Sequence, residues 1–126
     1  DDRTALREEL TREHHYIWNN QNNYGGWTCY LAQEPGQAEV PRYSVPARRF
    51  LLANLAPAWI GIGTADLFLD ESVEYANRLK EAGVDCELVL AKGGVHAFHG
   101  LHPEAEISIP FWESLFAFSR RTLNLA

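Results

Sequence analysis

The sequence predicts an α/β fold built around two neighbouring parallel strands. Residues 58–63 form a short apolar run between Pro57 and Thr64, which is typical of a strand buried on both faces. An amphipathic stretch follows and ends at Gly83, and a second apolar run covers residues 86–91. Strand, helix and strand with short connections form a βαβ unit, whose strands are parallel and joined by a right-handed crossover.

Length and composition indicate a folded chain of one domain. The chain has 126 residues, of which 46% are apolar and 22% charged, close to the globular average. Its formal net charge is −6 and its basic residues are scattered, which argues against binding to nucleic acid or to anionic membranes. An uncharged or small-molecule partner fits better.

The sequence shows no transmembrane or targeting segment and no cysteine framework. No apolar run approaches the roughly 18 residues of a membrane span, and no basic and then apolar signal segment opens the chain, so we expect a soluble, cytoplasmic protein. Cys29 and Cys86 are interpreted as reduced core residues, since neither metal spacing nor a disulfide pattern is present. Because the sequence contains no Met, we expect that it does not begin at its natural start codon.

Residues 1–57 are interpreted as an irregular connecting segment, whereas residues 58–126 carry the periodic patterns of the βαβ unit and its last helix. A short charged helix is predicted over residues 4–13, capped by Thr4 or Asp2. One or two helical turns are predicted over residues 27–32, after two glycines that break the chain. A surface loop is then marked by Pro35, Gly36, Pro41 and Pro46.

The helix between the two strands is predicted from its caps and its apolar face. Asp66 or Asp70 is expected to cap its start, and acidic residues follow in the first turn, where the helix dipole favours them. Gly83 is expected to end it in the left-handed conformation. The predicted buried side comprises Val73, Tyr75, Ala76, Leu79 and Ala82.

A loop rich in Gly and His is predicted over residues 92–103, and a long amphipathic helix from Glu104 to about Leu123. Pro110 lies within this pattern, so the helix either kinks there or begins after it. The predicted buried side comprises Ile107, Phe111, Leu115, Phe118 and Leu123.

Asp66 and His96 are the candidate catalytic residues. Each follows one of the two predicted strands, and the carboxyl ends of neighbouring parallel strands lie at the same edge of a sheet. The two side chains are therefore expected to lie side by side, as an Asp–His pair must for general-base catalysis. Two alternatives stay open: Asp66 is only a helix cap, and His96 is only a solvated loop histidine.

Two further sites are conceivable from the residues alone. His96, His99 and His102 are spaced three residues apart before Glu104, which makes a metal site formally possible, although glycine-interrupted loops rarely hold three ligands. Aromatic side chains at Trp18, Trp27, Tyr30 and Tyr43 could line an apolar pocket or simply pack over a sheet edge.

A resemblance to a known family runs over essentially the whole chain, and it is carried by residues 1–4, 27–31, 43–49, 55–64, 66–68, 70–71, 75–76, 78–79, 82–84, 93–98 and 103–105. These segments resemble the hormone-sensitive-lipase-like carboxylesterases, of the type called alpha/beta hydrolase fold-3. The resemblance implies the C-terminal βαβα part of an α/β-hydrolase fold.

In this family the catalytic triad occurs along the sequence in the order Ser, Asp, His, and the Ser lies on a Gly-x-Ser-x-Gly turn. The resemblance assigns the acid to Asp66 and the base to His96. The local pattern departs from the family's His-Gly-Phe at Ala97, and a frame in which His99 is the base is the runner-up. No serine lies in a Gly-x-Ser-x-Gly context, and no His-Gly-Gly oxyanion loop is present.

We therefore expect a C-terminal fragment of a serine carboxylic-ester hydrolase that lacks its nucleophile and is inactive alone. It would act on a small ester if completed by the missing half, with no cofactor or metal. Members of this family commonly dimerise through the final strand, here residues 86–91, so a homo-oligomer is expected. The alternative is a truncated chain that acts as a self-associating binding module.

Overall fold

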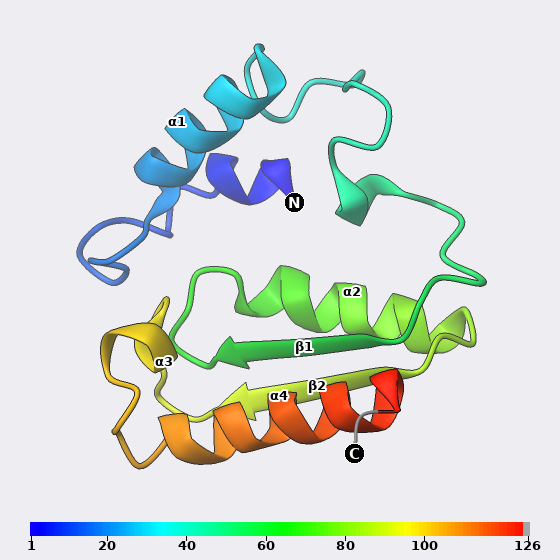
Figure 1. Ribbon diagram of the computed structural model, residues 1–126. Helices are drawn as coiled ribbons and strands as arrows, with labels where there is room; N and C mark the ends of the chain where they lie inside the picture. Colours follow the sequence, from blue (N-terminus) through cyan, green and yellow to red (C-terminus); the bar gives the residue numbers. More distant parts are fainter. Residues whose placement is uncertain (125–126) are drawn as a thin grey trace. The chain divides into compact units, whose positions relative to one another are not determined.

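The computed structural model describes residues 1–124, and the chain divides into two compact units, Asp1–Phe50 and Leu51–Ala126 (Figure 1). The second unit holds the predicted βαβ motif. Its strands are β1, Ala58–Gly63, and β2, Cys86–Ala91, and they pair in parallel from Ala58↔Cys86 to Gly63↔Ala91. The predicted α/β class, both strands and their parallel pairing are confirmed.

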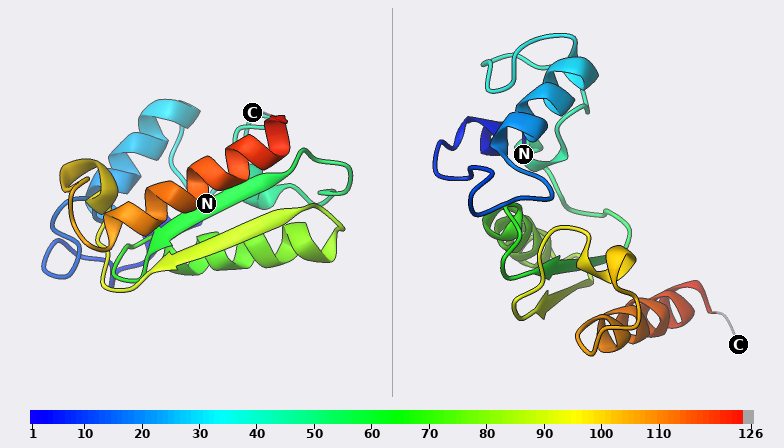
Figure 2. Two further views of the ribbon diagram at one scale, coloured as in Figure 1. Left: turned by 60° about the horizontal axis from the view of Figure 1, so that its bottom comes forward. Right: turned by 90° about the vertical axis from the view of Figure 1, so that its left-hand side faces the viewer.

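Helices α2, Leu69–Glu81, and α4, Ser108–Leu123, cover opposite faces of this sheet (Figure 2). Because side chains alternate along a strand, Ile60 packs toward α2 with Leu79 and Val84, whereas Trp59 packs toward α4 with Phe111. The expectation that β1 is buried on both faces is wrong: only Gly63 is fully buried. In the part of the chain that the structure describes, the sheet has two strands and β1 is paired along one edge only.

Helix α2 has the predicted extent but not the predicted cap. Its N-cap is Phe68, whose side chain makes no capping hydrogen bond, so neither Asp66 nor Asp70 has that position. Asp70 lies instead in the first turn, where the helix dipole stabilises its charge. Gly83 follows the helix with φ of 77°, the left-handed value that was predicted.

The predicted loop and last helix differ from the structure in three details. A short helix, α3, Phe98–Leu101, lies inside the predicted loop. Helix α4 begins at Ser108, and Pro110 sits in its first turn, where a missing N–H costs no intrahelical hydrogen bond. Phe111 and Phe118 are buried as predicted, but Ile107 and Leu123 are exposed.

The first unit is more regular than the sequence predicted. A 3₁₀ helix, η1, Asp2–Leu6, is capped by Asp1 and replaces the helix expected over residues 4–13. Helix α1, Asn20–Leu31, contains both glycines that were expected to break it. The Asn19 side chain caps α1 by accepting a hydrogen bond from the Asn22 N–H, and this cap offsets part of the glycine cost.

The proline-rich stretch after α1 forms turns and one short 3₁₀ helix, η2, Pro46–Arg48. Arg48 returns to the start of the chain, where its guanidinium binds both carboxylate oxygens of the fully buried Asp2 at 2.9 and 2.7 Å. Cys29 is exposed on α1, so its interpretation as a core residue is wrong. Within residues 1–124, no helix has the length and apolar character needed to cross a bilayer.

Candidate active site

The site lies at the carboxyl ends of β1 and β2. Because the strands pair in register up to Gly63↔Ala91, the loops that follow them leave the sheet side by side. The Thr64 N–H donates to the Ala91 carbonyl at 2.9 Å, and the Ala65 N–H donates to the Gly94 carbonyl at 2.9 Å. These bonds extend the strand pairing into the two loops.

Gly63 and Gly94 bring the two loops into backbone contact. A Cβ atom on Gly63 would overlap the Gly94 carbonyl, and a Cβ atom on Gly94 would press on the Phe98 ring. Both glycines are buried. The close approach therefore requires residues without side chains at these two positions, and it places Asp66 and His96 on adjacent segments.

Asp66 and His96 are in hydrogen-bonding contact. His96 Nδ1 lies 3.1 Å from Asp66 Oδ2, and the side chains are 31% and 5% exposed, respectively. The other carboxylate oxygen, Oδ1, accepts a hydrogen bond from the Phe68 N–H at 3.0 Å. One carboxylate thus shapes the turn before α2 and also faces the imidazole.

This geometry has the elements of an acid–base pair. A buried carboxylate opposite Nδ1 fixes the ring orientation and favours a proton on Nδ1. The partial exposure of His96 leaves part of the ring accessible from solvent. Such a pair can accept a proton from a bound hydroxyl through Nε2 and return it to a leaving group.

Phe68 and Ala97 shape the surroundings of His96. The Phe68 ring meets the imidazole edge-on, with ring centroids 5.5 Å apart and planes at 70°. Ala97 has φ of 58° and ψ of 17°, the left-handed conformation, and is the N-cap of α3. This left-handed residue turns the backbone immediately after His96, and the next side chain, Phe98, is buried.

The two other histidines of this loop have different surroundings. His99 stacks on Phe111 with centroids 4.9 Å apart and also meets Phe98 and Trp112 edge-on. Its Nδ1 is buried and has no hydrogen-bond partner within residues 1–124. His96, not His99, therefore faces Asp66.

His102 is exposed, and its Nδ1 lies 3.7 Å from a carboxylate oxygen of Glu104. The three histidines therefore do not converge on one point. Among the residues that the structure describes, no group of three or more His, Cys, Asp and Glu side chains is arranged to hold a metal ion.

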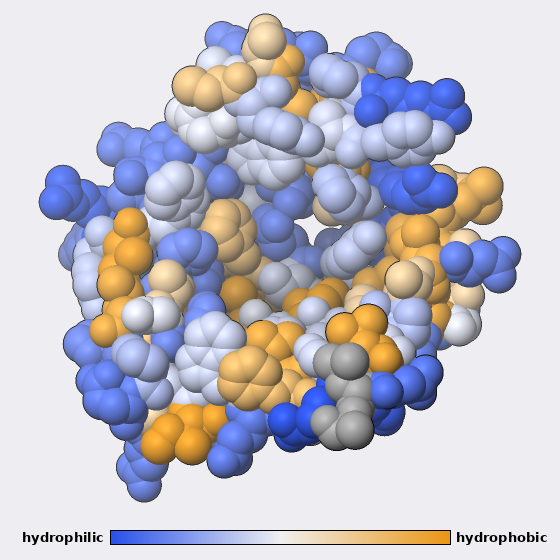
Figure 3. Space-filling view, in the orientation of Figure 1, coloured by the Kyte–Doolittle hydropathy of each residue, from blue (hydrophilic) through white to orange (hydrophobic). Residues whose placement is uncertain are grey.

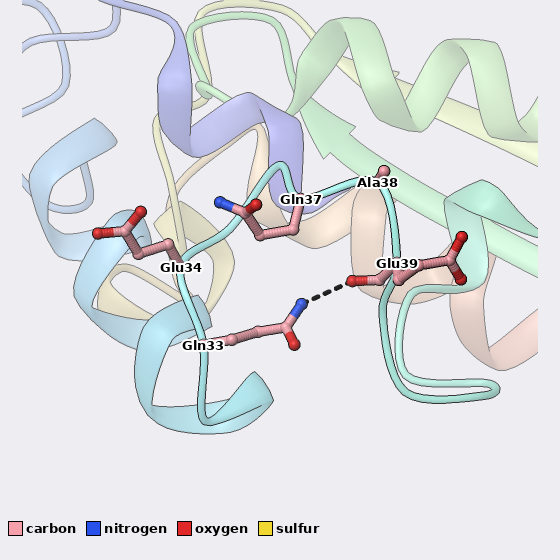
Figure 4. A pocket seen from close by; sticks show the side chains of 5 residues that line it. All are labelled: Gln33, Glu34, Gln37, Ala38 and Glu39. Atoms are coloured by element: carbon pink, nitrogen blue, oxygen red, sulfur yellow. Dashed lines mark hydrogen bonds between the residues drawn. The ribbon is translucent and has the colours of Figure 1, made fainter.

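The aromatic residues considered as a pocket lining all belong to the first unit. Tyr30 and Tyr43 are about two-thirds exposed, and Trp27 meets Tyr30 edge-on at 5.7 Å. A shallow, open hollow instead lies after α1, where Gln33 Nε2 donates a hydrogen bond to the Glu39 carbonyl at 2.7 Å (Figure 4). Its lining residues are Gln33, Glu34, Gln37, Ala38 and Glu39.

Sequence reasoning found Asp66 and His96 from the strand ends but gave no role to Thr64 or Phe68. These residues stand two positions before and two after Asp66. Phe68 contacts both members of the pair, and Thr64 hydrogen-bonds the loop that carries His96. No local pattern in the sequence identifies these contacts.

Comparisons with known proteins point to one family. A family model described as "alpha/beta hydrolase fold" matches residues 1–100. A solved structure described as "Bacterial Heroin Esterase" superposes with a TM-score of 0.86 and 29% identity, over 98% of this chain and 39% of that chain. Esterase LipW from Mycobacterium marinum superposes with a TM-score of 0.66 and 38% identity, over 74% of this chain and 28% of that chain.

A curated protein named "Esterase" from Fusarium pseudograminearum (strain CS3096) is 42% identical over 48 residues, which are 38% of this chain and 15% of the fungal protein. The matched regions therefore span well under half of each of these esterases.

Proposed function

Because the chain belongs to the alpha/beta hydrolase fold family, we propose that it supplies the acid and the base of a serine carboxylic-ester hydrolase. The observation that carries this proposal is the 3.1 Å contact between Asp66 Oδ2 and His96 Nδ1 at the ends of two parallel strands. The similarity to two solved esterases supports the same chemistry.

In the proposed reaction, a serine from outside this sequence attacks the ester carbonyl. His96 Nε2 takes the serine proton as the bond from Oγ to the acyl carbon forms, and it gives that proton to the alcohol as the ester C–O bond breaks. Water then attacks the acyl-enzyme in the same way and releases the acid. Asp66 holds the ring orientation and stabilises the imidazolium in both steps.

The serines of this sequence favour a nucleophile from elsewhere. Ser108 is fully buried, Ser114 bonds to Trp59 and Glu87, and none of the five serines has the Gly-x-Ser-x-Gly context of the family. We therefore propose that these 126 residues alone do not hydrolyse esters. Turnover of p-nitrophenyl butyrate by the purified chain that disappears in His96→Gln would contradict this.

The role of the pair is tested in a chimera in which this chain replaces the matching 39% of the bacterial heroin esterase. We expect ester hydrolysis that falls by on the order of 10³- to 10⁴-fold in Asp66→Asn and in His96→Gln. His102→Gln is the matched control, because His102 is exposed and lies outside the pair. An active chimera that tolerates His96→Gln would disprove the assignment.

The expected partner is a small ester rather than a nucleic acid, in keeping with the net charge of −6. Cytoplasmic localisation stays a prediction. The second candidate function is a self-associating binding module, and it is favoured by apolar side chains exposed along α4.

A further inference from the structure

We infer that Thr64 and Phe68 are positioning residues that hold His96 against Asp66. They stand two residues before and two after Asp66. Thr64 hydrogen-bonds the loop that carries His96, and Phe68 contacts His96 itself. The inference rests on the proposed function, because it concerns the geometry of the same acid–base pair.

Thr64 fixes the backbone of the loop that carries His96. Its Oγ1 accepts a hydrogen bond from the Gly93 N–H at 2.8 Å, and its own N–H donates to the Ala91 carbonyl at 2.9 Å. Gly93 has φ of 77°, so the loop turns sharply at the point that the hydroxyl holds. Thr64 is exposed, so core packing does not account for this contact.

Removing the Thr64 hydroxyl leaves the backbone hydrogen bonds at the strand ends in place. It removes the hydrogen bond that the Gly93 N–H donates to Thr64 Oγ1, so the turn at Gly93 is held less firmly. Gly63 and Gly94 meet through their backbones, and the Phe98 ring lies against Gly94, so within residues 1–124 no polar side chain besides Thr64 is seen to hold this turn. A turn that is free to shift carries His96, three residues beyond Gly93, away from the carboxylate. A displacement of about 1 Å is enough to impair catalytic geometry.

Phe68 contacts both members of the pair. Its N–H donates to Asp66 Oδ1 at 3.0 Å, which fixes the carboxylate plane and directs Oδ2 toward His96 Nδ1. Its ring meets the imidazole edge-on at 5.5 Å, which restricts the rotamers open to His96. One residue thus couples the orientation of the acid to that of the base.

The test is the tautomer of His96, read from the ¹⁵N signals of its ring in the 126-residue chain. Spectra are recorded in alkaline buffer, where imidazoles are neutral, and His96→Gln identifies the signals. Wild type is expected to show the Nδ1–H tautomer that faces a carboxylate, and Asp66→Asn is expected to lose it. We expect Thr64→Val and Phe68→Ala to shift the signals toward those of Asp66→Asn, while Thr64→Ser retains the wild-type signals.

Val84→Ala separates positioning from a general loss of stability. Val84 packs with Leu52 and Leu79 in the cluster on the α2 side of the sheet, so its truncation lowers the melting temperature and should leave the His96 signals unchanged. Wild-type signals in Thr64→Val would overturn the role of the Thr64 hydroxyl. Wild-type signals in Phe68→Ala would overturn the role of the Phe68 ring, since that variant keeps the backbone N–H bonded to Asp66. An equal shift in Val84→Ala would overturn both roles. If wild type itself lacks the Nδ1–H tautomer, the Asp66–His96 pair of the proposed function fails as well.

Discussion

Ala97 has a backbone conformation that glycine adopts at lower cost. Its φ of 58° is left-handed, and this conformation costs a residue with a Cβ about 1–2 kcal/mol in the folded state. Glycine avoids that cost, but its more flexible unfolded chain lowers the free energy of unfolding by about 0.4–1 kcal/mol. We therefore predict that Ala97→Gly raises the free energy of unfolding by about 0.5–1 kcal/mol. Urea unfolding followed by circular dichroism measures this.

Ala117→Gly is the matched control, because Ala117 is exposed in the interior of α4. Glycine there should lower the free energy of unfolding by about 1 kcal/mol. If both substitutions destabilise the chain equally, the backbone strain assigned to Ala97 is absent.

The two cysteines should differ in reactivity. Burial raises the pKa of the Cys86 thiol, whereas Cys29 is exposed on α1. A raised pKa means less thiolate at neutral pH, and the thiolate is the reactive form. We predict that iodoacetamide alkylates Cys29 first and Cys86 more slowly at pH 7, as followed by peptide mass spectrometry. In a denaturant the two rates should converge, and equal rates in the native chain would contradict the prediction.

At the scale of single residues, the sequence allowed the Asp66–His96 contact to be predicted but not the details around it. The contact follows from topology, because parallel strands in register end at one edge. The left-handed turn at Ala97 and the edge contact of Phe68 depend on packing between segments distant in sequence, so no local pattern reveals them.

At the scale of elements, strong periodicity gave reliable predictions and weak propensity did not. Residues 58–63 and 86–91 were predicted as strands with the observed bounds, since apolar runs between turn residues leave few alternatives. Only the last turns of α1 were predicted, over residues 27–32, because Gly25 and Gly26 oppose a helix locally. Its cap at Asn19 and its burial of Leu31 outweigh that local preference.

The buried pair of Asp2 and Arg48 joins η1 to η2 within the first unit. Asp2 is fully buried and also accepts a hydrogen bond from the Gly36 N–H at 2.7 Å, so removing its charge leaves Arg48 without its main partner. We predict that Asp2→Asn costs about 3–5 kcal/mol of local stability. Faster amide hydrogen exchange within residues 1–50 reports this loss.

Glu9→Gln is the control for Asp2→Asn. Glu9 pairs with Arg7 at 2.7 Å, but the Glu9 side chain is exposed and Arg7 is only half-buried, and ion pairs at the surface contribute little to stability. Hydrogen exchange that changes equally in the two variants would show that the buried pair does not hold the first unit together.

At the scale of the whole chain, the second unit leaves apolar surface uncovered. Ile109, Phe116 and Leu123 are spaced seven residues apart, so they share one face of α4, and they are 50%, 52% and 65% exposed. Figure 3 shows hydrophobic surface over this helix. Leu90 of β2 is also half exposed, and in the described sheet β1 and β2 are each paired along one edge only. Surfaces of this kind favour association.

We therefore predict that the chain forms an oligomer at micromolar concentration, to be measured by light scattering coupled to size exclusion. Phe116→Lys should shift the population toward a single chain, because it places a charge in the middle of the exposed stripe on α4. Tyr30→Lys is the control, since Tyr30 is 66% exposed but belongs to α1. It should leave the oligomer intact. A wild-type chain that elutes with the mass of one chain at these concentrations would contradict self-association and, with it, the binding-module alternative.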